Sequence, residues 1–438
     1  MNPNDWLSEI YTSDTGWEHL ENLVSIGGRL PGSGAERRAA KQTADVFKSI
    51  GIGNVFEETY AITGWQRGRS SIKHIETNSE YRCLALPRSP SVSATGSLVD
   101  VGYGLPETFE NTDVADQIVV VAAGVPENHD RYVHRMEKYR CAVEQGAAAF
   151  LFRSTRDGDL PMTGSLGSPD GALGEIPGVA VSKEVGLELV RRHESTPIEV
   201  ITEAEIGPAT SQNVHARIGP GTDERILLTS HLDAHDLGVG AVDNGTGTAV
   251  LVEVMRSLVQ SDITLEVDVE AIAFGSEEIN LVGSEHTAES IPSETIRAII
   301  NLDGVAQGRE LEVYPHGFDP IEEAVETIES DFGQEITTSE ITVPFSDHWP
   351  FAKRGVPTCF VTATTEALRG WGHTHGDTLD KVDRRDFREH AVLVSGLVQS
   401  LATTQESVPH RPREEVVAKL EQEGQLEGLE AMGWGPNE

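Results

Sequence analysis

The sequence is poor in cysteine and has no long apolar run. Its 438 residues include 3 cysteines, Cys83, Cys141 and Cys359, which are widely spaced and form no CxxC pair. A sparse, odd set argues against a disulfide framework and for a reducing compartment. No apolar run is long enough to span a bilayer, and the N-terminus lacks the basic and apolar regions of a signal peptide. We therefore expect a soluble, cytoplasmic protein with no membrane partner.

Positive charge is also scarce, since 34 Lys and Arg face 71 Asp and Glu and the formal net charge is -37. Nucleic acid and anionic membrane surfaces would be repelled, so neither is expected as a partner. The acidic residues are spread through every segment, and Lys is scarce beside Arg. This pattern is typical of a carboxylate-covered surface that depends on high salt to screen its self-repulsion, as in a halophile. An ordinary acidic protein is the alternative.

The order of the predicted elements indicates an α/β fold that carries an insertion. Residues 6–24 and 35–50 are predicted to be helical around a glycine-rich loop at 26–34, which we interpret as a structural turn because its spacing is not that of a P-loop. From about residue 54 the pattern changes to short strands and turns, typical of a smaller β-rich α/β module. From residue 213, strands and helices alternate as in a mostly parallel central sheet flanked by helices.

The chain divides into four predicted segments. They are 1–55, the first part of the main domain; 56–206, the inserted module; 207–404, the rest of the main domain; and 405–438, an acidic, helix-prone tail. We expect the tail to be a solvated appendage, with packing or an oligomer contact as the alternative.

A polar cluster follows the short apolar run at 226–228, which predicts a buried strand. The cluster contains His231, Asp233, His235, Asp236 and Asp243. Side chains at the C-terminal edge of a strand in an open α/β sheet face the crevice where ligands bind. Imidazole and carboxylate groups suit zinc and similar ions, so a metal site is predicted here. Caps and surface-loop residues are the alternative interpretation.

Later predicted strands also end in residues that can bind metals. Glu277 and Glu278 follow one strand, Asp303 follows the next, and His373 lies in a polar loop after a third. Paired glutamates can divide labour, one binding a metal and the other serving as a base. The alternative is an acidic helix start favoured by the helix dipole. Together with His231 and Asp243, these residues would lie on successive loops at one sheet edge, as in a two-metal site with a bridging carboxylate.

Six motifs occur in a fixed order, and the order is more specific than any one motif. They are HLDAHD, AVDNGTG, GSEE, NLDG, SDHWPF and HTHGDT. In this order they resemble the motifs of the dinuclear zinc aminopeptidase and glutamate carboxypeptidase family, over roughly residues 15–50 and 205–402. Residues 100–191 look like the protease-associated domain often inserted in such enzymes. The resemblance implies a zinc-exopeptidase-like fold, peptide hydrolysis and two zinc ions, with cobalt or manganese as substitutes.

The resemblance also implies a role for each site residue. The metal ligands would be His231 and Asp303 on one ion, Glu278 and His373 on the other, and Asp243 between them. Glu277 would be the general base that takes a proton from a metal-bridging water and passes it to the leaving amine. Asp233 would lie behind His231 and fix its tautomer.

One position departs from the family pattern. Many relatives have a tyrosine immediately before the final histidine ligand, where its hydroxyl helps stabilise the oxyanion, and here that residue is Gly372. Losing one such donor costs ~10²- to 10³-fold in rate where nothing replaces it. Trp371, His375 and His348 are the candidate replacements. His375 is also an alternative to His373 as the ligand, although the match of the following residues favours His373.

The two residues after HLDA stay ambiguous. His235 and Asp236 are interpreted either as loop residues that form hydrogen bonds or as substrate contacts.

The charged residues near the motifs indicate which end of a peptide is cleaved. An aminopeptidase needs a carboxylate to meet the free amine, whereas cleavage before a C-terminal acidic residue needs a basic pocket. Near the motifs only the isolated Lys353, Arg354 and Arg369 are basic, which favours an aminopeptidase. A carboxypeptidase or dipeptidase is the close alternative.

A single-zinc glutaminyl cyclase and a non-catalytic binding relative are disfavoured because all the ligand positions and Glu277 are present. The oligomeric state is open, with a homodimer as the candidate.

A halophilic surface predicts salt-dependent folding. Dialysis from high salt into dilute buffer should unfold the protein, because the unscreened carboxylates then repel one another. Circular dichroism measures the loss, and full structure with full activity at low salt would contradict the hypothesis.

Overall fold

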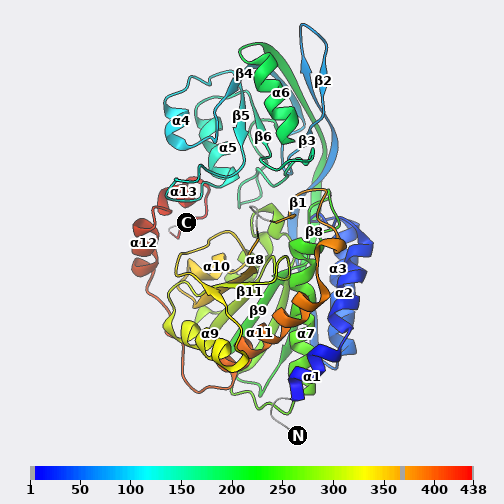
Figure 1. The fold of residues 1–438 in the computed structure, drawn as a ribbon, viewed down its shortest axis with the longest axis vertical. Helices are drawn as coiled ribbons and strands as arrows, with labels where there is room; N and C mark the ends of the chain where they lie inside the picture. Colours follow the sequence, from blue (N-terminus) through cyan, green and yellow to red (C-terminus); the bar gives the residue numbers. More distant parts are fainter. Residues whose placement is uncertain (1–4, 366–369, 437–438) are drawn as a thin grey trace.

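The computed structural model describes residues 5–365 and 370–436, which form two parts joined by a long antiparallel ribbon (Figure 1). The ribbon consists of β1 (Asn54–His74) and β8 (Pro197–Ile218), which pair from Asn54 opposite Arg217 to His74 opposite Ile198. The larger part lies at the lower end in Figure 1 and the smaller part at the upper end. The predicted boundaries at 55/56 and 206/207 fall inside these continuous strands, and they stay predictions.

The lower part is built on a mostly parallel sheet. Its strands are β9 (Arg225–His231), β10 (Asp268–Phe274), β11 (Ile296–Leu302), β12 (Leu311–Tyr314), β13 (Thr337–Thr338) and β14 (Thr358–Ala363). The order β14-β11-β9-β10 is parallel throughout, whereas β12 is antiparallel to β14 and β8 is antiparallel to β10. Every residue of β10 and β11 is buried, as expected for strands covered on both faces. The predicted mostly parallel sheet is confirmed.

Helices cover both faces of this sheet (Figure 1). They are α1 (Asp5–Thr12), α2 (Thr15–Ile26), α3 (Gly34–Ser49), α7 (Thr246–Gln260), α8 (Val282–Ser290), α9 (Asp319–Phe332), α10 (Trp349–Ala352) and α11 (Arg384–Ala402), with short turns η1 (Ala241–Gly245), η2 (Glu277–Ile279), η3 (Ser293–Thr295) and η4 (Leu379–Lys381). Side chains of β9 alternate between the faces: Ile226 and Leu228 pack on the side of α7 and α11, and Leu227 packs on the side of α8 and α10. Within the described ranges, no helix has the length and apolar character needed to traverse a bilayer.

The helix predicted over residues 6–24 is two helices, α1 and α2. The chain turns at Ser13, whose hydroxyl donates to Glu253 Oε2 at 2.9 Å and accepts from the backbone N–H of Thr15 at 3.1 Å. These local hydrogen bonds replace the helical ones at this point.

The upper part is a smaller α/β unit, which confirms the predicted inserted module. Its elements are β2 (Glu80–Tyr81), β3 (Leu84–Ala85), β4 (Val92–Asp100), α4 (Pro106–Glu110), β5 (Ile118–Ala122), α5 (Arg135–Glu144), β6 (Ala149–Arg153), β7 (Gly178–Val181) and α6 (Lys183–His193). Strands β4, β5, β6 and β7 are parallel, and β4 joins the ribbon through antiparallel pairing with β8. Apolar clusters fill both faces of this sheet.

The C-terminal tail is packed, which corrects the prediction of a solvated appendage. It forms α12 (Arg413–Gln422) and α13 (Leu426–Ala431) beside the junction of the two parts (Figure 1). Leu420 and Trp434 are buried in a cluster that includes Met136 of α5 and Trp349 of α10. Trp349 Nε1 donates to the carbonyl of Trp434 at 2.9 Å. The abundant charge of the tail hid the few apolar side chains that hold it in place.

Candidate metal centre and active site

The carboxyl ends of the parallel strands bring the predicted site residues to one edge of the lower sheet. The positions are the end of β9 for His231, η1 for Asp243, η2 after β10 for Glu277 and Glu278, the residue after β11 for Asp303, and the loop beyond β14 for His373. Side chains that follow adjacent parallel strands meet at the same edge. The sheet topology therefore accounts for their convergence.

Two groups of potential metal donors lie side by side at this edge. The first contains His231, Asp243 and Asp303, and the second contains His235, Glu278 and His373, with the donor atoms of each group within 4.8 Å of one another. Asp243 reaches both groups. Its Oδ1 lies 3.3 Å from His231 Nε2, and its Oδ2 lies 3.2 Å from His373 Nε2. All the predicted ligands are thus brought together, with Asp243 between the groups.

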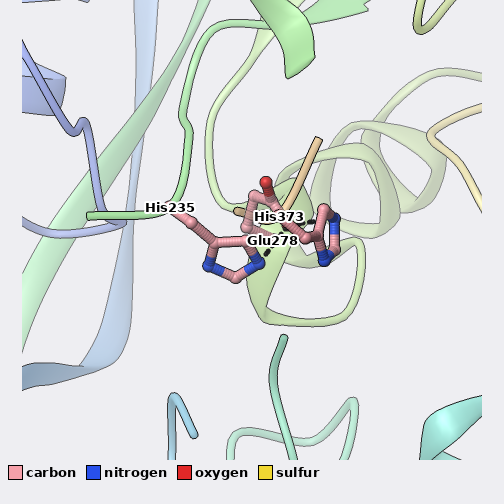
Figure 2. Close-up of side chains that lie close together, drawn as sticks. All are labelled: His235, Glu278 and His373. Carbon is pink, nitrogen blue, oxygen red and sulfur yellow. Dashed lines mark ion pairs between the residues drawn. The ribbon is translucent and has the colours of Figure 1, made fainter. Parts of the chain in front are cut away.

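His235 is the unexpected member of the second group (Figure 2). Its Nε2 lies 2.7 Å from Glu278 Oε2, and His373 Nε2 lies 3.3 Å from the same oxygen. Burial lowers the pKa of His235 to about 3, so its imidazole is neutral. The sequence analysis interpreted His235 as a loop residue that forms hydrogen bonds or as a substrate contact. It did not predict that His235 lies in a group of three potential metal donors.

Opposing effects set the charges of the first group. Burial disfavours the imidazolium of His231, but nearby Glu277, Asp243 and Asp303 outweigh burial and raise its pKa well above the usual value. Burial likewise opposes the carboxylate of Asp243, yet hydrogen bonds from His231 and His373 lower its pKa well below the usual range. The protein therefore favours a charged carboxylate on Asp243, between the two donor groups.

Glu277 lies beside Glu278 on a turn that Asp233 fixes. Its backbone N–H donates to Asp233 Oδ1 and that of Glu278 donates to Asp233 Oδ2, both at 3.1 Å, so Asp233 fixes the turn that carries the two glutamates. Burial, together with the charges of Glu278, Asp303 and Asp347, raises the pKa of Glu277 well above the usual value. A carboxylate with a raised pKa accepts a proton more readily.

The predicted role of Asp233 as the partner of His231 stays a prediction. Asp233 Oδ1 lies 3.7 Å from His231 Nδ1, which is beyond hydrogen-bond range, whereas the Asp233 carbonyl lies at 3.1 Å. Burial raises the pKa of this carboxyl to about 7.

A chain of side chains holds Asp303. Ser346 Oγ donates to Asp303 Oδ2 at 2.8 Å, Asn301 Nδ2 donates to Ser346 Oγ at 2.9 Å, and Thr229 Oγ1 donates to Asn301 Oδ1 at 2.7 Å. Ser346 is the first residue of the SDHWPF motif, so this motif contributes to the site by orienting a carboxylate.

The glycine-rich loop at 26–34 packs against the loop that follows β9 and helps to hold that loop in place. The buried Arg29 donates to the carbonyls of Leu232 at 2.7 Å, Val239 at 2.7 Å and Gly240 at 2.9 Å. A Cβ at Gly28 would come within 2.6 Å of Asp236 Cα, so this close approach requires glycine. The sequence predicted a structural turn here, and it did not predict the contacts of Arg29 with the loop after β9.

Asp377 of the HTHGDT motif holds the backbone at Val242 and Asp243. Its carboxylate accepts from Val242 N at 2.7 Å and Asp243 N at 3.1 Å. His375 points elsewhere: its Nδ1 hydrogen-bonds to the carbonyl of Leu237 at 2.9 Å and its side chain is exposed. This geometry favours His373 over His375 as the ligand.

A cavity of about 590 Å³ opens beside Asp243 and Asp303. Aromatic side chains form much of its wall, namely Tyr132, Tyr314, Phe345 and Phe360. Tyr132 comes from the upper part and Gln425 comes from the tail. All three segments of the chain therefore contribute to one cavity next to the candidate metal centre.

The candidates to replace the missing tyrosine lie outside the cavity wall. Trp371 packs against Arg156 and Lys381, each 4.6 Å from its ring. His348 is buried and its Nε2 hydrogen-bonds to the carbonyl of Val343 at 2.7 Å. Among the described residues, the tyrosine hydroxyls at the cavity come from Tyr132 and Tyr314.

The basic residues considered for a carboxypeptidase pocket are already paired. Lys353 Nζ and Arg354 Nη2 contact the two carboxylate oxygens of Glu285 at 2.9 and 2.5 Å. In the cavity wall, Arg131 makes two contacts with Glu137, at 2.8 and 2.5 Å. Arg369 lies outside the described residues.

Known proteins share both parts of this architecture. Residues 213–398 match the model of peptidase family M28, and residues 94–189 match that of the PA domain. The aminopeptidase YwaD of Bacillus subtilis is 25% identical over 410 residues, covering 90% of this chain and 86% of that protein. Carboxypeptidase Q of Bos taurus is 26% identical over 283 residues, covering 61% and 59%.

A solved structure has the same fold. It is BSAP, described as a zinc aminopeptidase from Bacillus subtilis, with a TM-score of 0.71 and 23% identity over 90% of this chain and 96% of that one. The ordered motifs, the converging strand ends and both family matches lead to one conclusion: residues 213–398 form a domain of the peptidase family M28 type, and residues 94–189 form a PA domain.

Proposed function

We propose that this chain is a zinc-dependent aminopeptidase that removes the N-terminal residue of peptides. The observation that carries the proposal is the pair of donor groups shared by Asp243, with the base-like Glu277 beside them and a large cavity at their edge. The names of YwaD and BSAP support release of N-terminal residues. A carboxypeptidase or dipeptidase is the second candidate, favoured by the similarity to carboxypeptidase Q.

The donor chemistry fits two zinc ions, with cobalt or manganese as substitutes, because imidazole and carboxylate are ligands that zinc accepts. His231 Nε2 is buried and lies 3.3 Å from Asp243 Oδ1 and 3.6 Å from Asp303 Oδ1, as expected of atoms that share one ion. We assign His231 and Asp303 to one ion, Glu278 and His373 to the other, and Asp243 to both. When bound, the ions would acidify water and polarise the scissile carbonyl.

The residues of the chain supply the proton transfers. Glu277 takes a proton from the attacking water as its oxygen bonds to the scissile carbonyl carbon. It then gives the proton to the amine nitrogen as the C–N bond breaks. Asp233 keeps Glu277 in place through the backbone contact at 3.1 Å, and Ser346 orients Asp303.

The cytoplasmic location and the homodimer predicted from the sequence stay predictions. Neither is needed for this reaction, because the described residues of one chain include every proposed ligand and the proposed base.

The side chain of the N-terminal residue would enter the cavity of about 590 Å³. Glu312 and Tyr314 of β12 lie opposite Thr362 and Phe360 of β14, and all four line this cavity. Tyr314 Oη donates to Glu312 Oε1 at 2.7 Å, and the described residues offer Glu312 no ion-pair partner. Aromatic walls with a carboxylate that is not a proposed metal ligand suit a long basic side chain, because the apolar stem packs on the rings and the cation pairs with Glu312.

Two matched peptides test which end is cleaved. In high salt, the free-amine peptide Leu-Gly-Gly should release leucine in a chelator-sensitive reaction, whereas N-acetyl-Leu-Gly-Gly should not react. Amino acid analysis of the products measures both. Cleavage of both peptides from the other end would establish the carboxypeptidase instead, and cleavage of neither would remove the proposal.

Replacing the base tests its role. Glu277→Gln should retain the metal content of the wild type but lose ~10²- to 10⁴-fold in kcat, because the ligands remain while proton transfer is lost. Metal analysis and kcat are measured together, with the exposed Glu289→Gln as the matched control. A Glu277→Gln enzyme with full turnover would exclude this residue as the base.

Charge removal in the cavity tests the specificity. Glu312→Gln should lower kcat/KM for Lys-Gly-Gly about tenfold or more relative to Leu-Gly-Gly, because a hydrogen bond to a charged group contributes about 1.5–3 kcal/mol. The exposed neighbour Glu310→Gln is the control and should change neither substrate. An unchanged ratio in Glu312→Gln would mean that the basic side chain does not reach this carboxylate.

A further inference from the structure

His235 is a buried histidine whose ring is directed into the second donor group (Figure 2). Its Nε2 lies 2.7 Å from Glu278 Oε2, and its ring centre lies 4.5 Å from that of His373, with the ring planes at 77°. The two imidazoles therefore approach the same carboxylate from different directions.

The loop around His235 is fixed on both sides. Before it, the backbone N–H of Ala234 donates to the carbonyl of Arg29 at 3.2 Å. After it, the carboxylate of Asp236 accepts two hydrogen bonds from Arg67, at 2.9 and 2.6 Å. These anchors hold the imidazole inside the protein, so its position does not depend on a flexible loop.

A structural role in the loop does not account for this histidine. Nδ1 of His235 is buried and has no hydrogen-bond partner among the described residues, and Nε2 is directed at the Glu278 carboxylate at 2.7 Å; leaving a buried polar atom unpaired costs free energy. The space that it shares with Asp243, Glu278 and His373 is a void of about 10 Å³. A void of this size accommodates a single ion but no substrate side chain, and His235 does not line the larger cavity of about 590 Å³.

We propose that His235 is an additional ligand of the zinc ion held by Glu278 and His373. That ion then has four protein donors, counting the shared Asp243, whereas the ion held by His231 and Asp303 has three. A zinc with four protein ligands is closed, and one with three keeps a position open for water or substrate. The two ions would therefore be unequal: the site of His231 and Asp303 would keep a position open, and the site of His235, Glu278 and His373 would hold its ion more firmly.

The proposal rests on the proposed function only for the presence of zinc, and its test does not measure turnover. X-ray absorption at the zinc edge counts imidazole ligands per ion. In the two-zinc wild type, three histidines on two ions give an average of about 1.5 per zinc, whereas His231 and His373 alone give about 1.0. A wild-type value of 1.0 with two zincs bound would overturn the proposal and leave the aminopeptidase intact. Absence of bound zinc would overturn both.

A variant separates a ligand from a residue that merely holds Glu278. His235→Ala should lower the count to about 1.0 and weaken retention of the firmly held zinc by about tenfold or more during dialysis against graded chelator. His286→Ala, a histidine outside both groups with a 40% exposed side chain, is the matched control and should change neither. An unchanged count in folded His235→Ala would reject ligation, and the wild-type count decides the matter if this variant does not fold.

Discussion

The lower sheet gathers more carboxylates at one edge than its own cations can balance, and the arrangement of the site depends on this constraint. Burial raises the pKa of Asp233 and Asp377 to about 7, and that of Asp347 and Glu36 to about 8. Arg29 lies close enough to interact with several of these groups, yet burial lowers its own pKa to about 10. Divalent cations bound between the carboxylates would offset this excess charge.

Backbone N–H groups hold the acidic side chains in place, and one arginine holds the loop that follows β9. Asp233 accepts from the N–H groups of Glu277 and Glu278, and Asp377 accepts from those of Val242 and Asp243. Arg29 uses its guanidinium on carbonyls of the same loops. The geometry of the site is thus set by the polypeptide backbone, which limits how far the carboxylates can move apart under their mutual repulsion.

The convergence of His231, Glu278 and Asp303 could be expected from the sequence, because each follows a buried strand and parallel strands end at one edge. The ordered motifs then supplied the roles. The local sequence pattern was enough to predict this convergence, because each of these residues lies within a few positions of the end of its strand. The assignment of roles to individual ligands rests on the family resemblance and stays a prediction.

Contacts between distant segments could not be expected in the same way. Arg29 donates hydrogen bonds to a loop about two hundred residues later in the chain, and no periodicity in the sequence predicts this contact. The sequence of the tail predicted a charged, solvated segment, because only a few of its residues, such as Leu420 and Trp434, are apolar and packed against the rest of the protein. His235 lies in the HLDAHD motif, but only the fold of the loop decides whether its ring faces solvent, substrate or Glu278.

The cavity wall draws on the PA domain through Tyr132, on the peptidase sheet through Glu312 and on the tail through Gln425. Gln425 follows every other wall residue in the chain, so during synthesis it is the last of them to leave the ribosome. The chamber next to the metal centre therefore cannot be completed while the peptidase sheet and the PA domain are still being made. A hydrolase assembled in this order acquires its finished cavity only after the segment that carries Gln425 has been made.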